Sequence, residues 1–130
     1  MPIISKQISV FVENKPSRIA LITKTLRQRG VYVRAFMVAA AGEFGVIHSL
    51  VDDHTKGRQC LEEAGFTCIE TDVIEIKEVD QNLAVERAVS ILGQAGINVC
   101  YAYGSLLEGG SMILKTSDTG RAREILESLL

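Results

Sequence analysis

The chain has 130 residues, of which 47% are hydrophobic and 23% are charged, and its formal net charge at pH 7 is −2. This composition supplies enough apolar material for a packed core and excludes a disordered chain. No stretch approaches the roughly 18 consecutive apolar residues that a membrane helix needs, and the start lacks a signal-peptide pattern, so we expect a cytoplasmic protein without membrane contact.

The first half of the chain predicts a strand, a helix, a hairpin and a second helix. Alternating Ile8, Val10 and Val12 indicate a half-buried strand. Pro16 suits the first turn of a helix, and Gly30 suits its C-terminal cap. The expected elements are a strand over 7–12, a helix from Pro16 to Gly30, strands over 31–41 and 44–51 around a turn at Gly42, and a helix over about 55–64.

The second half predicts a similar order of elements. From Phe66 to Asp80 we expect two strands with a turn at Thr71 and Asp72, the first closing one unit and the second opening the next. The remaining expected elements are a helix over 83–95, a strand over 97–107, a turn at Gly109 and Gly110, a strand over 112–116 and a helix over 119–129.

The second half is a diverged repeat of the first. When Gly30 is set over Gly96, apolar positions coincide: Ile19 with Val85, Ile22 with Ala88, Leu26 with Leu92, Val31 with Ile97 and Val33 with Val99. We therefore predict an α+β, ferredoxin-like fold of two tandem β-α-β-β-α-β units, residues 1–71 and 72–130, each with an antiparallel sheet and helices on one face. The second unit lacks its last strand. A seam between such copies is a natural place for a small ligand.

Several motifs resemble those of the tandem ACT domain proteins. They are Asn14-Lys15-Pro16-Ser17-Arg18-Ile19-Ala20 after the first strand, Gly30-Val31-Tyr32 and Gly96-Ile97-Asn98 after helices, Glu43-Phe44-Gly45-Val46 in the hairpin, and Asp53-His54-Thr55-Lys56-Gly57 and Asp118-Thr119-Gly120-Arg121-Ala122 at helix starts. The resemblance implies a small regulatory module that binds amino acids or related molecules. In that family the first turn has the form Asn/Asp-x-Pro-Gly, so Ser17 stands where Gly is usual. The matching turn from Asp80 to Leu83 has neither Pro nor Gly, which implies that only the first loop keeps binding geometry.

The first loop provides one group of candidate ligand-binding residues. It leads into a helix N-terminus, where unpaired N–H groups and the helix dipole favour an anion such as an α-carboxylate. Lys15 and Arg18 add positive charge, and Asn14 or Glu13 would face the ammonium group. The alternative is that Asn14 and Ser17 only cap the helix. The group comprises Asn14, Lys15, Pro16, Ser17, Arg18 and Ile19.

A second candidate group lies on the strand after Gly96, the element that in the resembling family faces the loop of a neighbouring unit. It comprises Asn98, Cys100, Tyr101 and Tyr103. Alternation places Tyr101 and Tyr103 on one face, as in a pocket wall, although tyrosines here would equally suit a core between the units. We predict one asymmetric site per chain, with its loop from the first unit and its wall from the second.

Other chemistries find little support. His48 and His54 lack metal-ligand neighbours at a suitable spacing, and the three cysteines, Cys60, Cys68 and Cys100, form no CxxC pair. No nucleophile or phosphate-loop motif is present. We therefore expect no metal, no cofactor and no catalysis.

Nucleic acid binding is also disfavoured. Residues 14–42 carry six bases and no acid, and an RNA-recognition motif has the same element order. However, such a motif stacks bases on aromatic side chains, and the chain has only four Phe, three Tyr and no Trp. The basic stretch suits a solvated helix face.

Together these patterns predict a non-enzymatic module that binds an amino acid, forms a homodimer and regulates a protein partner. The alternative is a structural or protein-interaction module whose ligand site has decayed, and an enzyme subunit has only fold analogy behind it.

Overall fold

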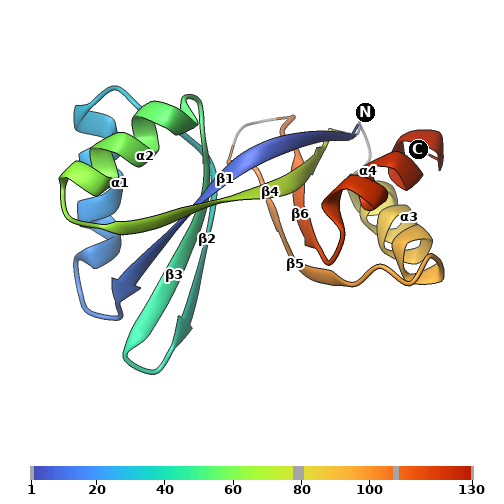
Figure 1. The fold of residues 1–130 in the computed structure, drawn as a ribbon, viewed down its shortest axis with the longest axis horizontal. Coiled ribbons are helices and arrows are strands. Elements are labelled where there is room, and N and C mark those ends of the chain that lie inside the picture. The colour runs from blue at the N-terminus through green and yellow to red at the C-terminus, as the bar shows by residue number, and fades with distance from the viewer. Residues whose placement is uncertain (1, 78–80, 107–108, 130) are drawn as a thin grey trace. The chain divides into compact units, whose positions relative to one another are not determined.

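The computed structural model describes residues 2–77, 81–106 and 109–129, and its elements follow the chain as six strands and four helices (Figure 1). They are β1 (Pro2–Glu13), α1 (Arg18–Gln28), β2 (Val33–Ala41), β3 (Phe44–Val51), α2 (His54–Glu63), β4 (Thr67–Ile76), α3 (Gln81–Gln94), β5 (Val99–Gly104), β6 (Met112–Thr116) and α4 (Thr119–Leu129). The α+β, ferredoxin-like fold predicted from the sequence is confirmed.

The chain divides into two compact units. The N-terminal unit is Lys6–Thr71, and the C-terminal unit combines Met1–Ser5 with Asp72–Leu130. The six-stranded antiparallel sheet has the order β2-β3-β1-β4-β6-β5, so that β1 and β4 each contribute residues to both units. The boundaries expected from sequence assign residues 1–5 to the first unit, whereas the structure groups them with the second.

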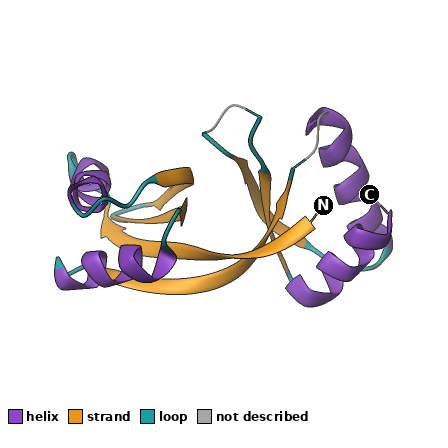
Figure 2. Ribbon diagram, turned by 90° about the horizontal axis from the view of Figure 1, so that it is seen from above, coloured by secondary structure: helices purple, strands orange, loops and turns teal. Residues whose placement is uncertain are grey.

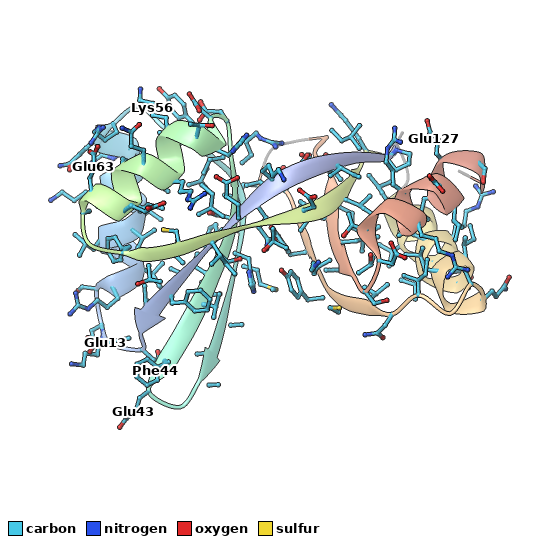
Figure 3. All side chains as sticks on the ribbon, viewed as in Figure 1. Glu13, Glu43, Phe44, Lys56, Glu63 and Glu127 are labelled. Atoms are coloured by element: carbon cyan, nitrogen blue, oxygen red, sulfur yellow. The ribbon has the colours of Figure 1, made fainter. Side chains whose placement is uncertain are left out.

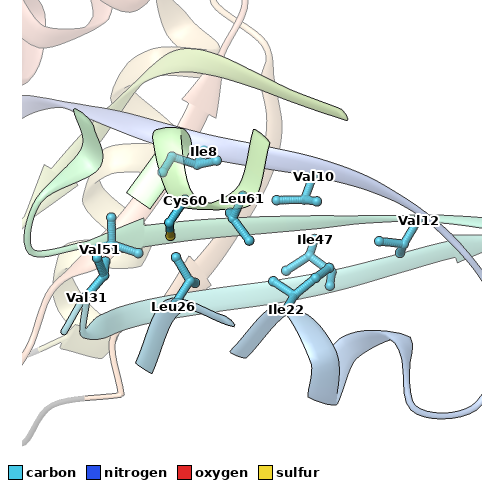
Figure 4. Close-up of a cluster of buried hydrophobic side chains, with 10 residues drawn as sticks. All are labelled: Ile8, Val10, Val12, Ile22, Leu26, Val31, Ile47, Val51, Cys60 and Leu61. Atoms are coloured by element: carbon cyan, nitrogen blue, oxygen red, sulfur yellow. The ribbon is translucent and has the colours of Figure 1, made fainter. Parts of the chain in front are cut away.

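In the N-terminal unit, α1 and α2 lie side by side against one face of the strands (Figure 1). Ile8 and Val10 of β1 alternate with polar neighbours and point toward Ile22 and Leu26 of α1, and these four side chains are nearly inaccessible to solvent (Figure 4). Ile19 has the same apolar spacing along α1, but its side chain remains 39% exposed and is not part of this core. The inner face of α1 is therefore buried in the core, whereas its first turn is exposed to solvent.

The C-terminal unit builds its core from the repeated positions. Ala88 and Leu92 of α3 and Ile97 are buried together, at the positions that match Ile22, Leu26 and Val31 of the first core. In Figure 2, α3 and α4 lie on one side of the strands of this unit.

Both first helices also end in the same way. Gly30 and Gly96 have φ angles of 75° and 74°, a left-handed conformation that glycine adopts without steric cost. In each case the N–H of the next residue donates to a leucine carbonyl, Val31 to Leu26 and Ile97 to Leu92, both at 2.9 Å. The repeat inferred from sequence is therefore a repeat of packing and of helix capping.

The region around Thr71 and Asp72 corrects a sequence-based expectation. It was expected to turn, but β4 is one continuous strand over Thr67–Ile76. β1 is also longer than predicted and begins at Pro2.

The start of β1 occupies the place of the strand that the second repeat lacks. In the C-terminal unit, Ser5 Oγ donates a 2.6 Å hydrogen bond to Glu75 Oε1 of β4. On the other side of β4, Ile74 pairs with Leu114 of β6. The unit therefore has four strands, although its own sequence supplies three.

Among the described residues, no helix has the length and apolar character needed to cross a lipid bilayer.

Candidate functional site

The loop between β1 and α1 is held in an unusual backbone conformation. Ser17 has φ 72° and ψ −2°, and it is the one described non-glycine residue with a positive φ. A side chain in the left-handed region clashes with its own backbone, whereas glycine adopts this region freely. This backbone conformation explains why the resembling family prefers Gly at this position. Ser17 adopts the same conformation at a cost in strain.

Capping does not explain the polar residues of this loop. Ser17 occupies the N-cap position of α1 but makes no side-chain cap hydrogen bond. Asn14 bonds to the β2–β3 hairpin: its Nδ2 donates to the Gly42 carbonyl at 3.0 Å, and its N–H donates to the Glu43 carbonyl at 2.7 Å. The first-turn N–H groups of α1 are thus left without a side-chain acceptor, as an anion site requires.

The charges of the loop are unequally paired. Lys15 Nζ lies 2.8 Å from Glu13 Oε2 in an exposed ion pair. Lys15, and to a smaller extent Arg18, lower the pKa of the Glu13 carboxyl below its usual 4.5. The part-buried Arg18 itself has no ion pair or hydrogen bond from its guanidinium to any described residue. Its charge is therefore available to an anion.

A cavity of about 500 Å³ opens beside Arg18 within the N-terminal unit. It is lined where β1, β2 and β3 meet the start of β4, and its lining includes Phe11, Glu13, Arg18, Phe44, Gly45 and Phe66. Figure 3 shows Glu13, Glu43 and Phe44 at this end of the unit. A second, shallower hollow of about 500 Å³ runs along Lys15, Pro16, Ser17 and the first turns of α1, and shares Arg18 with the first.

The structure thus brings together the predicted loop residues from Lys15 to Arg18. Ile19 is exposed at the start of α1, and Asn14 anchors the loop from outside the cavity lining. Sequence reasoning missed the three phenylalanines, Phe11, Phe44 and Phe66. The only signal for them was Phe44 in the hairpin motif and the spacing of two between Phe11 and Glu13.

The second candidate group lies in the C-terminal unit. Tyr101 and Tyr103 of β5 stack with ring centroids 6.4 Å apart and planes at 25°, so their predicted common face is confirmed. Asn98 donates its backbone N–H to Ser117 Oγ at 3.0 Å, and Cys100 is an exposed free thiol. The two candidate groups belong to different units, and a site that combines them stays a prediction.

His48 and Cys68 are both partly buried in the N-terminal unit. His48 Nδ1 lies 2.8 Å from Ser9 Oγ and 3.2 Å from Gln7 Nε2, and burial lowers the pKa of His48. Burial likewise raises the pKa of the Cys68 thiol to about 11, which leaves it un-ionised at neutral pH. The described residues contain no group of three or more His, Cys, Asp or Glu that could hold a metal ion.

A family model described as an ACT domain pair matches residues 3–129. The chain belongs to the ACT domain pair family. No curated protein matches its sequence. Within this ACT domain pair, the turn that corresponds to the first loop begins at Asp80, outside the described residues, and α3 begins at Gln81.

Solved structures share the fold of this ACT domain pair. Protein BT0572 from Bacteroides thetaiotaomicron has 25% sequence identity and a TM-score of 0.84, over 98% of this chain and 89% of its own. The ligand-free regulatory subunit of aspartate kinase from Thermus thermophilus has 14% identity and a TM-score of 0.70, over 97% and 94%. The corresponding subunit from Thermus flavus has 14% identity and a TM-score of 0.64, over 96% and 91%. At 14% identity the two kinase subunits show the fold alone.

Proposed function

We propose that this ACT domain pair is a non-enzymatic regulatory module that binds an α-amino acid at the loop between β1 and α1. The observation that supports the proposal most strongly is Arg18, a part-buried cation that lines a cavity and whose guanidinium makes no ion pair or hydrogen bond with a described residue. An unpaired guanidinium beside a cavity is suited to a carboxylate, which it binds through two parallel hydrogen bonds.

The N-terminus of α1 supports the same assignment. Its first-turn N–H groups, including that of Ile19, have no side-chain acceptor, and the helix dipole adds a partial positive charge there. Both features favour an anion near the start of α1. The strained backbone at Ser17 keeps the turn tight at this point.

The ammonium group of the ligand is assigned to Glu13. Its lowered pKa keeps the carboxylate charged at neutral pH. The pair with Lys15 is exposed on both sides, and an exposed ion pair contributes little because water screens both charges, so a ligand ammonium replaces Lys15 at little cost. Asn14 is less suited, because its amide already holds the hairpin.

Regulation follows if the ligand binds one arrangement of the protein more tightly than another, because the difference in affinity then shifts the equilibrium between them. We propose that the shift between arrangements changes the packing of a homodimer or the contact with a regulated protein. The lining of the cavity beside Arg18 includes none of Asn98, Cys100, Tyr101 and Tyr103, and the proposal does not depend on them.

A thermal-shift panel of the common amino acids at millimolar concentration tests the binding. A ligand at about 100 times its dissociation constant stabilises the folded state by about 2.7 kcal/mol. Arg18→Gln should remove this stabilisation. Arg27→Gln, which removes an exposed arginine from the last turn of the same helix, should retain it.

A decayed site is the alternative, because Ser17 adds a side chain where the family usually has none. Absence of stabilisation by every amino acid, in the wild type and in Ser17→Gly alike, would contradict our proposal and favour a structural or protein-interaction module.

A further inference from the structure

Three phenylalanines surround the cavity that Arg18 lines. Phe11 lies in β1, Phe44 lies in β3, and Phe66 directly precedes β4. Phe11 and Phe44 are 45% and 65% exposed, and Phe66 packs with one side on the core. Large aromatic side chains left open around one cavity are unusual on a folded unit and mark a surface that binds apolar groups.

The strand register fixes these rings close to the charged groups. Glu13 lies directly opposite Phe44 in the β1–β3 pair, which places their Cβ atoms about 4.5–5.5 Å apart. Phe11, two residues before Glu13, projects from the same face of β1. An ammonium group bound at Glu13 therefore carries the rest of its molecule directly onto the rings of Phe11 and Phe44.

Small residues leave room for that molecule. Ala39, Ala41 and Gly45 line the same cavity. The resulting volume of about 500 Å³ falls in the range of about 300–1,000 Å³ that is usual for small-ligand sites.

We infer that the ligand is an α-amino acid with a large apolar side chain, aliphatic or aromatic, whose side chain packs on Phe11 and Phe44. The inference rests on the proposed function, since Arg18 and Glu13 hold the carboxylate and the ammonium group. An aspartate side chain would lose hydration against these rings without gaining a partner, and a lysine ammonium would lose more hydration than its attraction to the ring faces returns. Leucine and phenylalanine therefore bind more tightly than alanine, lysine or aspartate.

Isothermal titration of the full chain with glycine, alanine, leucine, phenylalanine, lysine and aspartate tests this selectivity. Leucine should bind at least about tenfold more tightly than alanine, because each methylene buried in an apolar site adds affinity. Phe44→Ala should weaken leucine binding by about fivefold or more and leave alanine binding nearly unchanged. Tyr32→Ala is the matched control, because Tyr32 is an aromatic residue of the same unit, 70% exposed and outside the cavity lining.

The outcomes separate the two proposals. Binding of lysine, aspartate or alanine as tightly as leucine, or full leucine affinity in Phe44→Ala, would overturn the selectivity while leaving amino acid binding in place. Absence of binding by every amino acid would overturn the proposed function itself. Equal binding of leucine and its 2-oxo acid would overturn the role of Glu13, because the oxo acid has no ammonium group.

Discussion

Ser17 holds a backbone conformation that costs a serine energy and a glycine almost none. Its hydroxyl is not used to cap α1, so capping does not offset the strain. A residue kept in such a conformation next to a cavity is typical of sites where loop geometry serves binding. Mutation of Ser17 can distinguish the effect of its backbone strain on stability from any effect of its hydroxyl as a helix cap.

Ser17→Gly should raise the free energy of unfolding by about 0.5–1 kcal/mol, because relief of the left-handed strain exceeds the added entropy of the unfolded chain. Ser17→Ala should change it by less than about 0.5 kcal/mol, whereas loss of a true N-cap would cost about 1 kcal/mol. Urea denaturation of both variants makes the measurement. A large loss in Ser17→Ala would show that the hydroxyl caps the helix.

His48 lies in a polar cluster with Gln7 and Ser9, and burial lowers its pKa below 6.5. Between pH 6.5 and this lower folded-state value, the unfolded chain binds more protons at this residue than the folded chain. Stability should therefore fall as the pH is lowered through this window.

His48→Gln should flatten the dependence of unfolding free energy on pH between 7.5 and 5.5, as measured by urea denaturation. His54→Gln leaves the cluster intact and should keep the dependence. If the slope is the same in His48→Gln and in the wild type, the cluster does not control it.

The sequence predicted the charged part of the candidate site better than its apolar part. Lys15 and Arg18 follow a recognisable turn, so local chemistry was enough to select them. Phe11, Phe44 and Phe66 meet only through the register of β1 and β3 and the path into β4. Pairing between distant strands sets such a register, and one sequence does not display it.

Helix α2 approaches the sheet closely at Gly57. A Cβ added there would lie 3.1 Å from Val51 Cγ2, 3.2 Å from Ile8 Cδ1 and 3.4 Å from Val31 Cγ1. All three neighbours are buried in the core, which leaves them little room to move. The glycine thus lets the helix backbone pack directly on the strands.

Gly57→Ala should lower the unfolding free energy by about 1 kcal/mol, because overpacking that costs about 1–3 kcal/mol exceeds the gain in helix propensity of about 1 kcal/mol. Gly93→Ala is the control within α3, where an added Cβ meets no atom within 4 Å, and it should stabilise the protein by up to about 1 kcal/mol. Thermal unfolding measures both. Stabilisation by both substitutions would show that the contacts at Gly57 relax freely.

The helices were predictable because their signals are local. Apolar spacing and the glycines at positions 30, 65 and 96 placed them to within about two residues. The full length of strand β4 was not predictable, because the residue types of Thr71 and Asp72 favour a turn. Pairing of Ile74 and its neighbours with β6 holds the segment extended and outweighs that local preference.

At the scale of the whole chain, the first residues complete the unit formed by the last ones. Met1–Ser5 belong to the C-terminal unit, where Ser5 bonds to Glu75 of β4. This exchange was not predictable from the sequence, because the lengths of β1 and β4 depend on pairing across the full length of the chain. The repeat predicted an incomplete second unit, and the structure shows how it is completed.

Deletion of residues 1–5 should increase hydrogen exchange at β4 and β6 within the C-terminal unit more than at β3. The removed segment belongs to that unit and bonds there to Glu75, so we expect its loss to expose β4. Ser5→Ala should cost about 1 kcal/mol by removing one hydrogen bond. Equal acceleration of exchange at β3 and β6, with no cost in Ser5→Ala, would contradict this role.

In the function we propose, the loop between β1 and α1 receives the carboxylate of an amino acid. The most direct measurement is an NMR titration of the full chain with L-leucine, followed through backbone amide shifts, with L-leucinamide as the ligand that lacks the carboxylate. We expect saturable shifts centred on Arg18, Ile19 and Phe44 with leucine, and much weaker shifts with leucinamide and in Arg18→Gln. Shifts centred away from this loop, or equal shifts with leucine and leucinamide, would contradict it.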